Sequence, residues 1–165
     1  MTNTYIGIDP SKHMGIVALN GDEHYHEAIH DTTFDGKKTN PFNLLTYLCA
    51  LIHSSRGNEG DTVYVGVEKP PFTKQKGGYT ILYSQAKRNG IIQLACLMYG
   101  AEYHEVPVVT WKRIVVGKGT ASKADIVAHV QLKMGITYPT GTPQDAYDAA
   151  CVAEWMKRTV EDGVE

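Results

Sequence analysis

Four carboxylates in this 165-residue sequence occupy positions from which acids could act together. Asp9 and Glu68 end the apolar, β-branched stretches "TYIGID" and "TVYVGVE", and a proline follows each within two residues. Asp145 and Asp148 begin the apolar stretch "PQDAYDAACVAEW" at the i, i+3 spacing that puts two side chains on one face of a helix. Like charges at a buried edge repel each other unless something positive lies beside them. The pattern therefore raises the question of what that positive partner is.

A divalent cation would supply that positive charge. Mg²⁺ binds oxygen ligands, typically takes one or two protein carboxylates per ion and keeps waters or phosphate oxygens. Two such ions about 3.5–4 Å apart stabilise the attacking and leaving oxygens in phosphodiester hydrolysis. If Asp9 and Glu68 lie at neighbouring strand ends, where ligands of open α/β sheets gather, the four acids could meet at one metal site.

Each acid also has a simpler explanation. Asp145 could satisfy free amides at the start of a helix while Asp148 is solvated, because acids are common in a first helical turn. Asp9 could begin a turn, and Glu68 could be a charge at the edge of a sheet. For any one acid alone the simpler explanation is preferred, and the metal site rests on their conjunction.

The elements that must position these acids follow from hydrophobic periodicity and from proline and glycine breaks. Strands are expected at 4–9, 15–20, 24–31, 62–68 and 101–108. Helices are expected after Asn40-Pro41, at 79–99 with Gly90 packed closely on a neighbour, at 110–117 from Thr110, at 122–134 with Ser122 and Asp125 as a capping box, and from Thr142-Pro143 onward. A meander followed by alternating strands and helices predicts an α/β fold with a mixed five-stranded sheet and helices on both faces.

Length and composition indicate one globular domain over residues 1–165. The hydrophobic and charged fractions, 42% and 21%, are ordinary for a folded protein, and no apolar run is long enough for a membrane span. The N-terminus lacks the pattern of a secretion signal, so we expect a cytoplasmic protein without membrane contact. Cys49, Cys96 and Cys151 stand among apolar neighbours and are expected to be core thiols.

Charge is distributed unevenly along the chain. The net charge is −2, yet residues 69–133 contain ten lysines and arginines against three acids. A basic middle segment could form one face that gathers phosphates, or it could be a solvated surface with a chance asymmetry. The charge count alone does not separate these two interpretations.

Four motifs, in order, resemble those of the RuvC family of Holliday-junction resolvases: "YIGIDPS…GIVAL", "YVGVEKPPF", "VVTWKRIVVGKGTASKADI" and "PQDAYDAACVAEW". The resemblance runs from about residue 4 to residue 157. It implies an RNase H-like fold and a homodimer that cuts four-way junctions and other branched DNA. It also implies Mg²⁺ as cofactor, with two ions per site and Mn²⁺ able to replace it, and products with 5′-phosphate and 3′-hydroxyl ends.

The resemblance also implies roles for individual residues. The family's four metal-binding acids correspond to Asp9, Glu68, Asp145 and Asp148. Lys112 and Lys123 correspond to basic residues near the scissile phosphate. Lys123 would lie at the start of a helix, where backbone amides favour an anion; otherwise it is a surface lysine paired with Asp125 or solvent.

A basic segment around Phe72 is the expected contact with DNA bases. Phe72 matches an aromatic of the family that contacts bases at the junction, and with Lys74 and Lys76 beside it there is no obvious core for it to join. Such a side chain can stack on or wedge between unpaired bases. Further DNA contacts are expected from Lys112, Arg113 and Lys118, whereas Trp111 is assigned to the core.

The sequence departs from the family pattern at Ser11, where glycine is common, and at the stiff Pro70-Pro71. These departures leave the acids intact but bear on base preference. Two other functions are alternatives: a non-catalytic module that binds branched DNA, which should have lost an acid, and an actin-like ATPase domain. The ATPase would need a second glycine-rich phosphate loop and a further subdomain, for which 165 residues leave no room.

Overall fold

The computed structural model describes residues 3–11, 13–20, 23–31, 41–57, 60–69 and 78–163. Its strands are β1 (Thr4–Asp9), β2 (His13–Asn20), β3 (Glu23–Asp31), β4 (Val63–Lys69) and β5 (Glu102–Pro107). Its helices are α1 (Pro41–Ser54), α2 (Gly78–Tyr99), α3 (Val108–Trp111), the π-helix η1 (Lys112–Val116), α4 (Lys123–Leu132) and α5 (Gln144–Asp162). The predicted α/β fold is confirmed.

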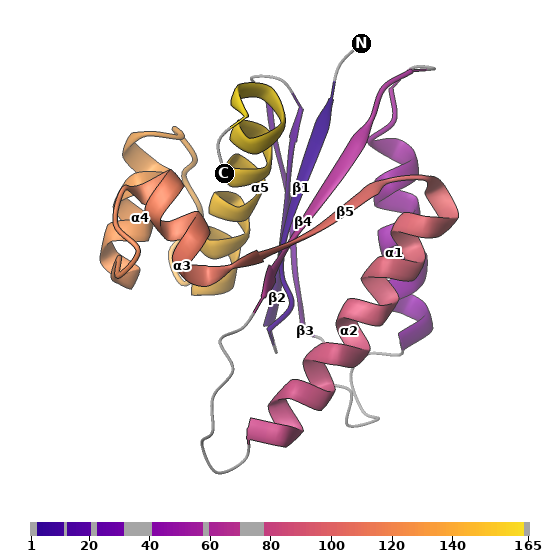
Figure 1. The fold of residues 1–165 in the computed structure, drawn as a ribbon. Helices are drawn as coiled ribbons and strands as arrows, with labels where there is room; N and C mark the ends of the chain where they lie inside the picture. The colour runs from indigo at the N-terminus through magenta and orange to yellow at the C-terminus, as the bar shows by residue number, and fades with distance from the viewer. Residues whose placement is uncertain are drawn as a thin grey trace.

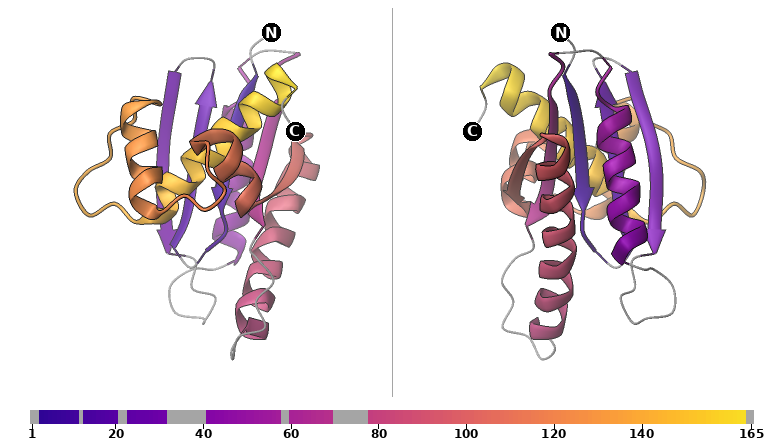
Figure 2. Two further views of the ribbon diagram at one scale, coloured as in Figure 1. Left: turned by 60° about the vertical axis from the view of Figure 1, so that its left-hand side comes forward. Right: turned by 90° about the vertical axis from the view of Figure 1, so that its right-hand side faces the viewer.

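The strands form one mixed sheet in the order β3-β2-β1-β4-β5. β1 pairs antiparallel with β2 and parallel with β4, and β4 pairs parallel with β5. Helices α3, α4 and α5 lie on one side of the sheet and α1 and α2 on the other (Figure 1). The two views of Figure 2 show α5 crossing one face and α1 beside α2 on the opposite face. Helices cover both faces, as predicted.

Alternate residues of the central strands enter two separate cores. Ile6 and Ile8 of β1 pack with residues of α1 and α2, whereas Tyr5 packs with residues of α5. In β4, Val67 belongs to the α1–α2 side and Tyr64 to the α5 side. Because side chains alternate along a strand, the last residues of β1 and β4 on the α5 side are two of the predicted acids.

Helix α5 lies directly on the sheet because two glycines leave room for its backbone. A Cβ at Gly7 would collide with the backbone of Ala149 and Ala153, and a Cβ at Gly15 would collide with the carbonyl group of Asp145. The buried face of α5 consists mainly of small residues, which allows the same close approach. The first turn of α5 is therefore held against β1 and β2.

Several local predictions can be compared with the structure. The capping box of α4 is confirmed: the Asp125 backbone amide donates to the Ser122 hydroxyl at 3.2 Å, and the Ser122 amide donates to the Asp125 carboxylate at 2.8 Å. The helix expected from Thr110 begins at Val108 instead, directly after the extended residue Pro107, and continues as the π-helix. Gly90 is exposed and a Cβ there would meet no atom within 4 Å, so its predicted close packing is wrong.

The prediction of buried thiols is confirmed, since Cys49, Cys96 and Cys151 are all buried and free. Within the described ranges, no helix is both long enough and apolar enough to cross a membrane.

Candidate metal centre

Three of the four predicted acids form a compact cluster. Asp9, Glu68 and Asp148 each offer a carboxylate oxygen, and these oxygens lie within 4.8 Å of one another. Asp9 is only 6% exposed, and the other two are partly buried. Asp145, one helical turn before Asp148, is outside this group but close enough to raise the pKa of each of the three acids by charge repulsion.

Sheet geometry explains why Asp9 and Glu68 meet. β1 and β4 are parallel neighbours in which Ile8 pairs with Val67, so the next residue of each strand is an acid at the same edge. Side-chain alternation turns both acids toward α5. The start of α5 then brings Asp148 to them, because Gly15 lets the first turn of this helix approach the sheet.

Burial and mutual repulsion make the charged form of the cluster unfavourable. Burial raises the pKa of Asp9, and the charges of Glu68, Asp145 and Asp148 raise it further. Burial and then the charge of Asp148 raise the pKa of Glu68, and burial also raises the pKa of Asp148. Such a site favours either protons or a bound cation.

Each acid of the cluster accepts a hydrogen bond from a neutral N–H group. The Ser11 backbone amide donates to Asp9 Oδ1 at 3.0 Å, and Gln144 Nε2 donates to Asp148 Oδ1 at 2.9 Å. Trp111 Nε1 donates to Glu68 Oε2 at 3.0 Å. These bonds lower the pKa of each carboxyl group and restrict its orientation.

Lys112 and Lys123 both lie near the acids, since the charge of each lowers the pKa of Asp148. Lys112 Nζ donates to the Ala121 carbonyl at 3.2 Å, and its charge lowers the pKa of both Glu68 and Asp148. Lys123 is exposed, is the first residue of α4, and also lowers the pKa of Asp148. The Asp125 carboxylate caps the helix through Ser122, and the exposed position of Lys123 fits the alternative of a lysine that faces solvent.

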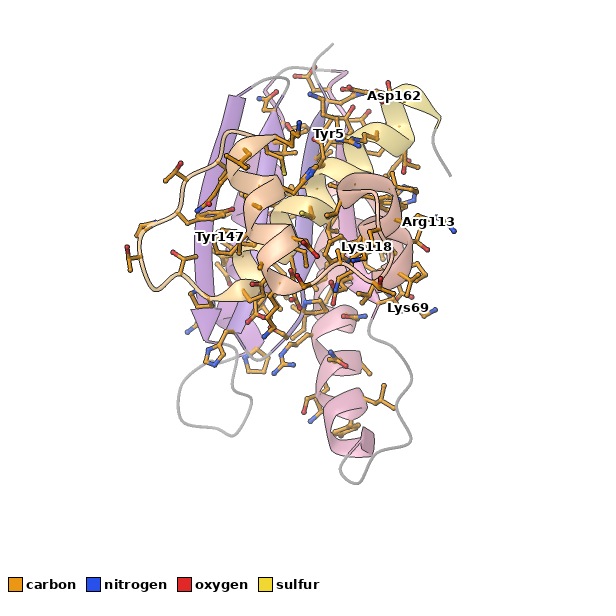
Figure 3. The ribbon with its side chains drawn as sticks, turned by 90° about the vertical axis from the view of Figure 1, so that its left-hand side faces the viewer. Tyr5, Lys69, Arg113, Lys118, Tyr147 and Asp162 are labelled. Atoms are coloured by element: carbon orange, nitrogen blue, oxygen red, sulfur yellow. The ribbon has the colours of Figure 1, made fainter. Side chains whose placement is uncertain are left out.

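The other predicted DNA contacts divide into two groups. Arg113 and Lys118 are exposed, and Figure 3 shows both beside α3 and η1 on the same half of the view as Lys69. The same view shows α5 running from near Tyr147 toward Asp162 across the sheet. Phe72, Lys74 and Lys76 lie outside the described residues.

Three residues near the acids were not predicted as part of the site. Arg88 of α2 is only 6% exposed, donates from Nη1 to the Pro10 carbonyl at 3.2 Å, and its pKa is lowered by burial and raised by the charge of Asp9. Trp111 was expected only in the core, and Gln144 was not singled out. Gln144 had a readable signal, its i, i+4 spacing to Asp148 on one helix. Trp111 bonds to Glu68 and Arg88 to the Pro10 carbonyl, and both partners are far away in sequence.

The donor set fits a hard divalent cation. The cluster consists of carboxylate oxygens, the ligands that Mg²⁺ and Mn²⁺ prefer over nitrogen or sulfur. Its acids come from two strand ends and a helix. Because these carboxylates repel one another, binding of a cation between them is electrostatically favourable. Within the part of the chain that the structure describes, this is the one group of at least three such side chains with mutually close ligand atoms.

No protein-family model matches the sequence. A comparison with curated proteins finds no match either. Among solved structures, that of Thermus thermophilus RuvC matches with a TM-score of 0.75 and 20% identity, over 99% of this chain and 97% of that one.

A second match is T. thermophilus RuvC in complex with a Holliday junction substrate, with a TM-score of 0.79 and 19% identity, over 97% of this chain and 96% of that one. The resemblance predicted from the motifs is thereby confirmed at the level of fold. The chain has the RNase H-like α/β fold seen in RuvC, over nearly its full length.

Proposed function

We propose that this chain is a structure-selective endodeoxyribonuclease that resolves four-way junctions, and other branched DNA, by metal-dependent hydrolysis of phosphodiester bonds. The observation that carries the proposal is the cluster of Asp9, Glu68 and Asp148 at the end of two parallel strands. The fold that carries the cluster adds support, because the same fold occurs in a protein whose structure has been solved in complex with a Holliday junction.

Asp9, Glu68 and Asp148 would hold the metal, with Asp145 adjacent as a fourth ligand. Mg²⁺ is the proposed cation, two ions per site, with Mn²⁺ able to replace it. When bound, the metal would neutralise the carboxylates and stabilise charge on the attacking and leaving oxygens. The protein contributes the fixed acids, whose hydrogen bonds to Trp111, Gln144 and the Ser11 amide limit their freedom.

Lys112 and Lys123 would stabilise negative charge that develops on the phosphate. The positive charges of both lysines lower the pKa of Asp148, so a scissile phosphate beside that acid would be attracted to both. Lys112 is also restrained by its bond to the Ala121 carbonyl, which reduces the reorganisation needed when DNA binds. Lys123 adds its charge to the free amides at the start of α4.

Arg113 and Lys118 would contact the DNA backbone. Both are exposed beside η1 and close in sequence to Lys112. Contacts of this kind position DNA without reading its sequence and weaken with salt. Phe72, Lys74 and Lys76 are proposed to contact unpaired bases and the backbone at the branch point.

A homodimer would match the two-fold symmetry of a four-way junction and allow paired cuts. Helix α2 offers apolar side chains to a partner: Leu97 is 80%, Tyr83 64% and Met98 58% exposed. Leu97→Glu should shift the protein toward monomer in analytical ultracentrifugation. Leu132→Glu, on α4 and also 80% exposed in the wild type, should leave the mass unchanged.

Junction cleavage tests the function directly. A labelled four-way junction and a linear duplex of the same composition are incubated with the protein while Mg²⁺ is titrated. The junction should be cut in a metal-dependent way and the duplex should stay intact. Asp148→Asn should bind the junction without cutting it, whereas Asp162→Asn, an exposed acid at the other end of α5, should cut as the wild type does.

Two results would contradict the proposal. Junction binding by the wild type without cleavage at any Mg²⁺ concentration would favour a non-catalytic DNA-binding module. Equal cleavage by wild type and Asp148→Asn would remove the acid cluster from the reaction.

A further inference from the structure

Glu68 is held by a side chain that lies 43 positions away in the sequence. Trp111 Nε1 donates to Glu68 Oε2 at 3.0 Å, and the indole is fully buried. An indole N–H can only donate a hydrogen bond, so the polarity of this contact is fixed. The bond therefore restricts the rotation of the Glu68 carboxylate and engages one of its two oxygens.

The indole is itself rigidly mounted. Trp111 ends α3 and precedes the π-helix η1, and it packs into the core on the α5 side of the sheet. Arg158 of α5 donates to the Ile114 carbonyl at 3.2 Å and pairs with Glu154 at 2.8 Å, which ties η1 to the helix that carries Asp148. Trp111, which donates to Glu68, and the helix that carries Asp148 therefore belong to one packed unit.

A neutral donor has an advantage over a charged one at this position. A lysine or arginine bonded to Glu68 would compensate its charge and compete with a cation for the carboxylate. An indole N–H orients the carboxylate and leaves its full negative charge available. Removal of a residue that hydrogen-bonds to a metal ligand typically weakens metal binding by roughly 10- to 100-fold.

We propose that Trp111 is a positioning residue of the metal centre, whose indole N–H holds Glu68 in the orientation that binds the divalent cation. This inference rests on the proposed function, because it assumes that the acid cluster binds metal. It assigns Trp111 no contact with DNA.

The second tryptophan offers an internal control. Trp155 lies in the same core and is 8% exposed, but its Nε1 is buried and has no hydrogen-bond partner among the described residues. Of the two indoles, Trp111 is the one whose N–H bonds to an acid of the cluster. A signal that follows Trp111 and not Trp155 therefore reports on the surroundings of Glu68.

The test uses the full chain, without DNA, in two measurements. The indole ¹⁵N–¹H resonances of the wild type are followed while MgCl₂ is added, and Mg²⁺ affinity is measured by calorimetry for the wild type, Trp111→Phe and Trp155→Phe. The Trp111 resonance should shift along the Mg²⁺ binding curve while that of Trp155 stays nearly fixed. Trp111→Phe should weaken Mg²⁺ binding by roughly 10-fold or more, and Trp155→Phe should bind as the wild type does.

An unmoved Trp111 resonance in a protein that does bind Mg²⁺, or unchanged affinity in Trp111→Phe, would overturn the inference and leave the proposed function intact. No Mg²⁺ binding by the wild type would overturn both. The resonance measurement needs no substitution, so it decides the question even if Trp111→Phe is unstable.

Discussion

The backbone carbonyl of Asp145 lies so close to Gly15 that no side chain could stand between them. This contact joins the start of α5 to β2 and determines how near its two acids come to the strand ends. The position of the metal centre thus depends on a residue that carries no functional group.

Gly15→Ala should displace the first turn of α5 and separate Asp148 from Asp9 and Glu68. Overpacking of this kind costs roughly 1–3 kcal/mol, so we expect a lower melting temperature together with weaker Mg²⁺ binding. Gly90→Ala is the matched control, because a Cβ there meets nothing within 4 Å and alanine favours an exposed helix. A Gly15→Ala protein with wild-type Mg²⁺ affinity would show that α5 is not placed by this contact.

The metal-free protein should lose stability as pH rises above about 4, the ordinary pKa of carboxyl groups. Burial, followed by repulsion from neighbouring acids, raises the pKa of Asp9 and Glu68 in the folded state. The folded chain therefore binds more protons than the unfolded chain between the ordinary and the raised pKa, and stability falls with pH across that window. Thermal melts in EDTA at increasing pH measure this, and Mg²⁺ should restore stability at the upper end.

Asp9→Asn removes the most strongly affected carboxyl group and should flatten that pH dependence. Asp162→Asn, at the exposed end of α5, should keep the wild-type profile. A metal-free wild type that gains stability over the same window would contradict the charge repulsion on which the site is built.

Lys112→Met should separate metal binding from cleavage. Loss of the ammonium group removes a positive charge near Glu68 and Asp148. At a pH above the raised pKa of Glu68, where that acid is ionised, Mg²⁺ should therefore bind the more negative cluster at least as tightly. Junction cleavage should nevertheless fall by a factor on the order of 10²–10³, as for the loss of one group that stabilises transition-state charge. Lys133→Met, exposed at the end of α4, should change neither quantity; weaker Mg²⁺ binding in Lys112→Met would contradict this role.

Gln144→Ala should weaken Mg²⁺ binding by roughly 10-fold, because Asp148 loses the N–H donor that orients it. Gln144→Glu should also bind Mg²⁺ more weakly than the wild type, since the glutamate places a like charge at i, i+4 from Asp148. Calorimetry on these two variants and on Gln131→Ala, an exposed glutamine of α4, measures the effect. Equal affinities in Gln144→Ala and Gln131→Ala would show that the Gln144 bond plays no part.

The sequence by itself determined the parts of this protein that local rules control. Strand alternation and the breaks after Asp9 and near Glu68 predicted where two acids lie, and helical spacing paired Asp145 with Asp148. The capping box at Ser122 was readable because its two partners are three residues apart. The order of the four motifs resembles that of the RuvC family, and this resemblance implied the RNase H-like fold.

Tertiary structure decided what depends on contacts between distant segments. Asp148, not Asp145, joins the close cluster with Asp9 and Glu68, because the docking of α5 on Gly7 and Gly15 sets the rotation of that helix. Arg88 reaches the Pro10 carbonyl from 78 positions away, and no local pattern encodes such a contact. Periodicity shows that a residue such as Trp111 is buried, but only the packed fold determines which polar atom its N–H meets.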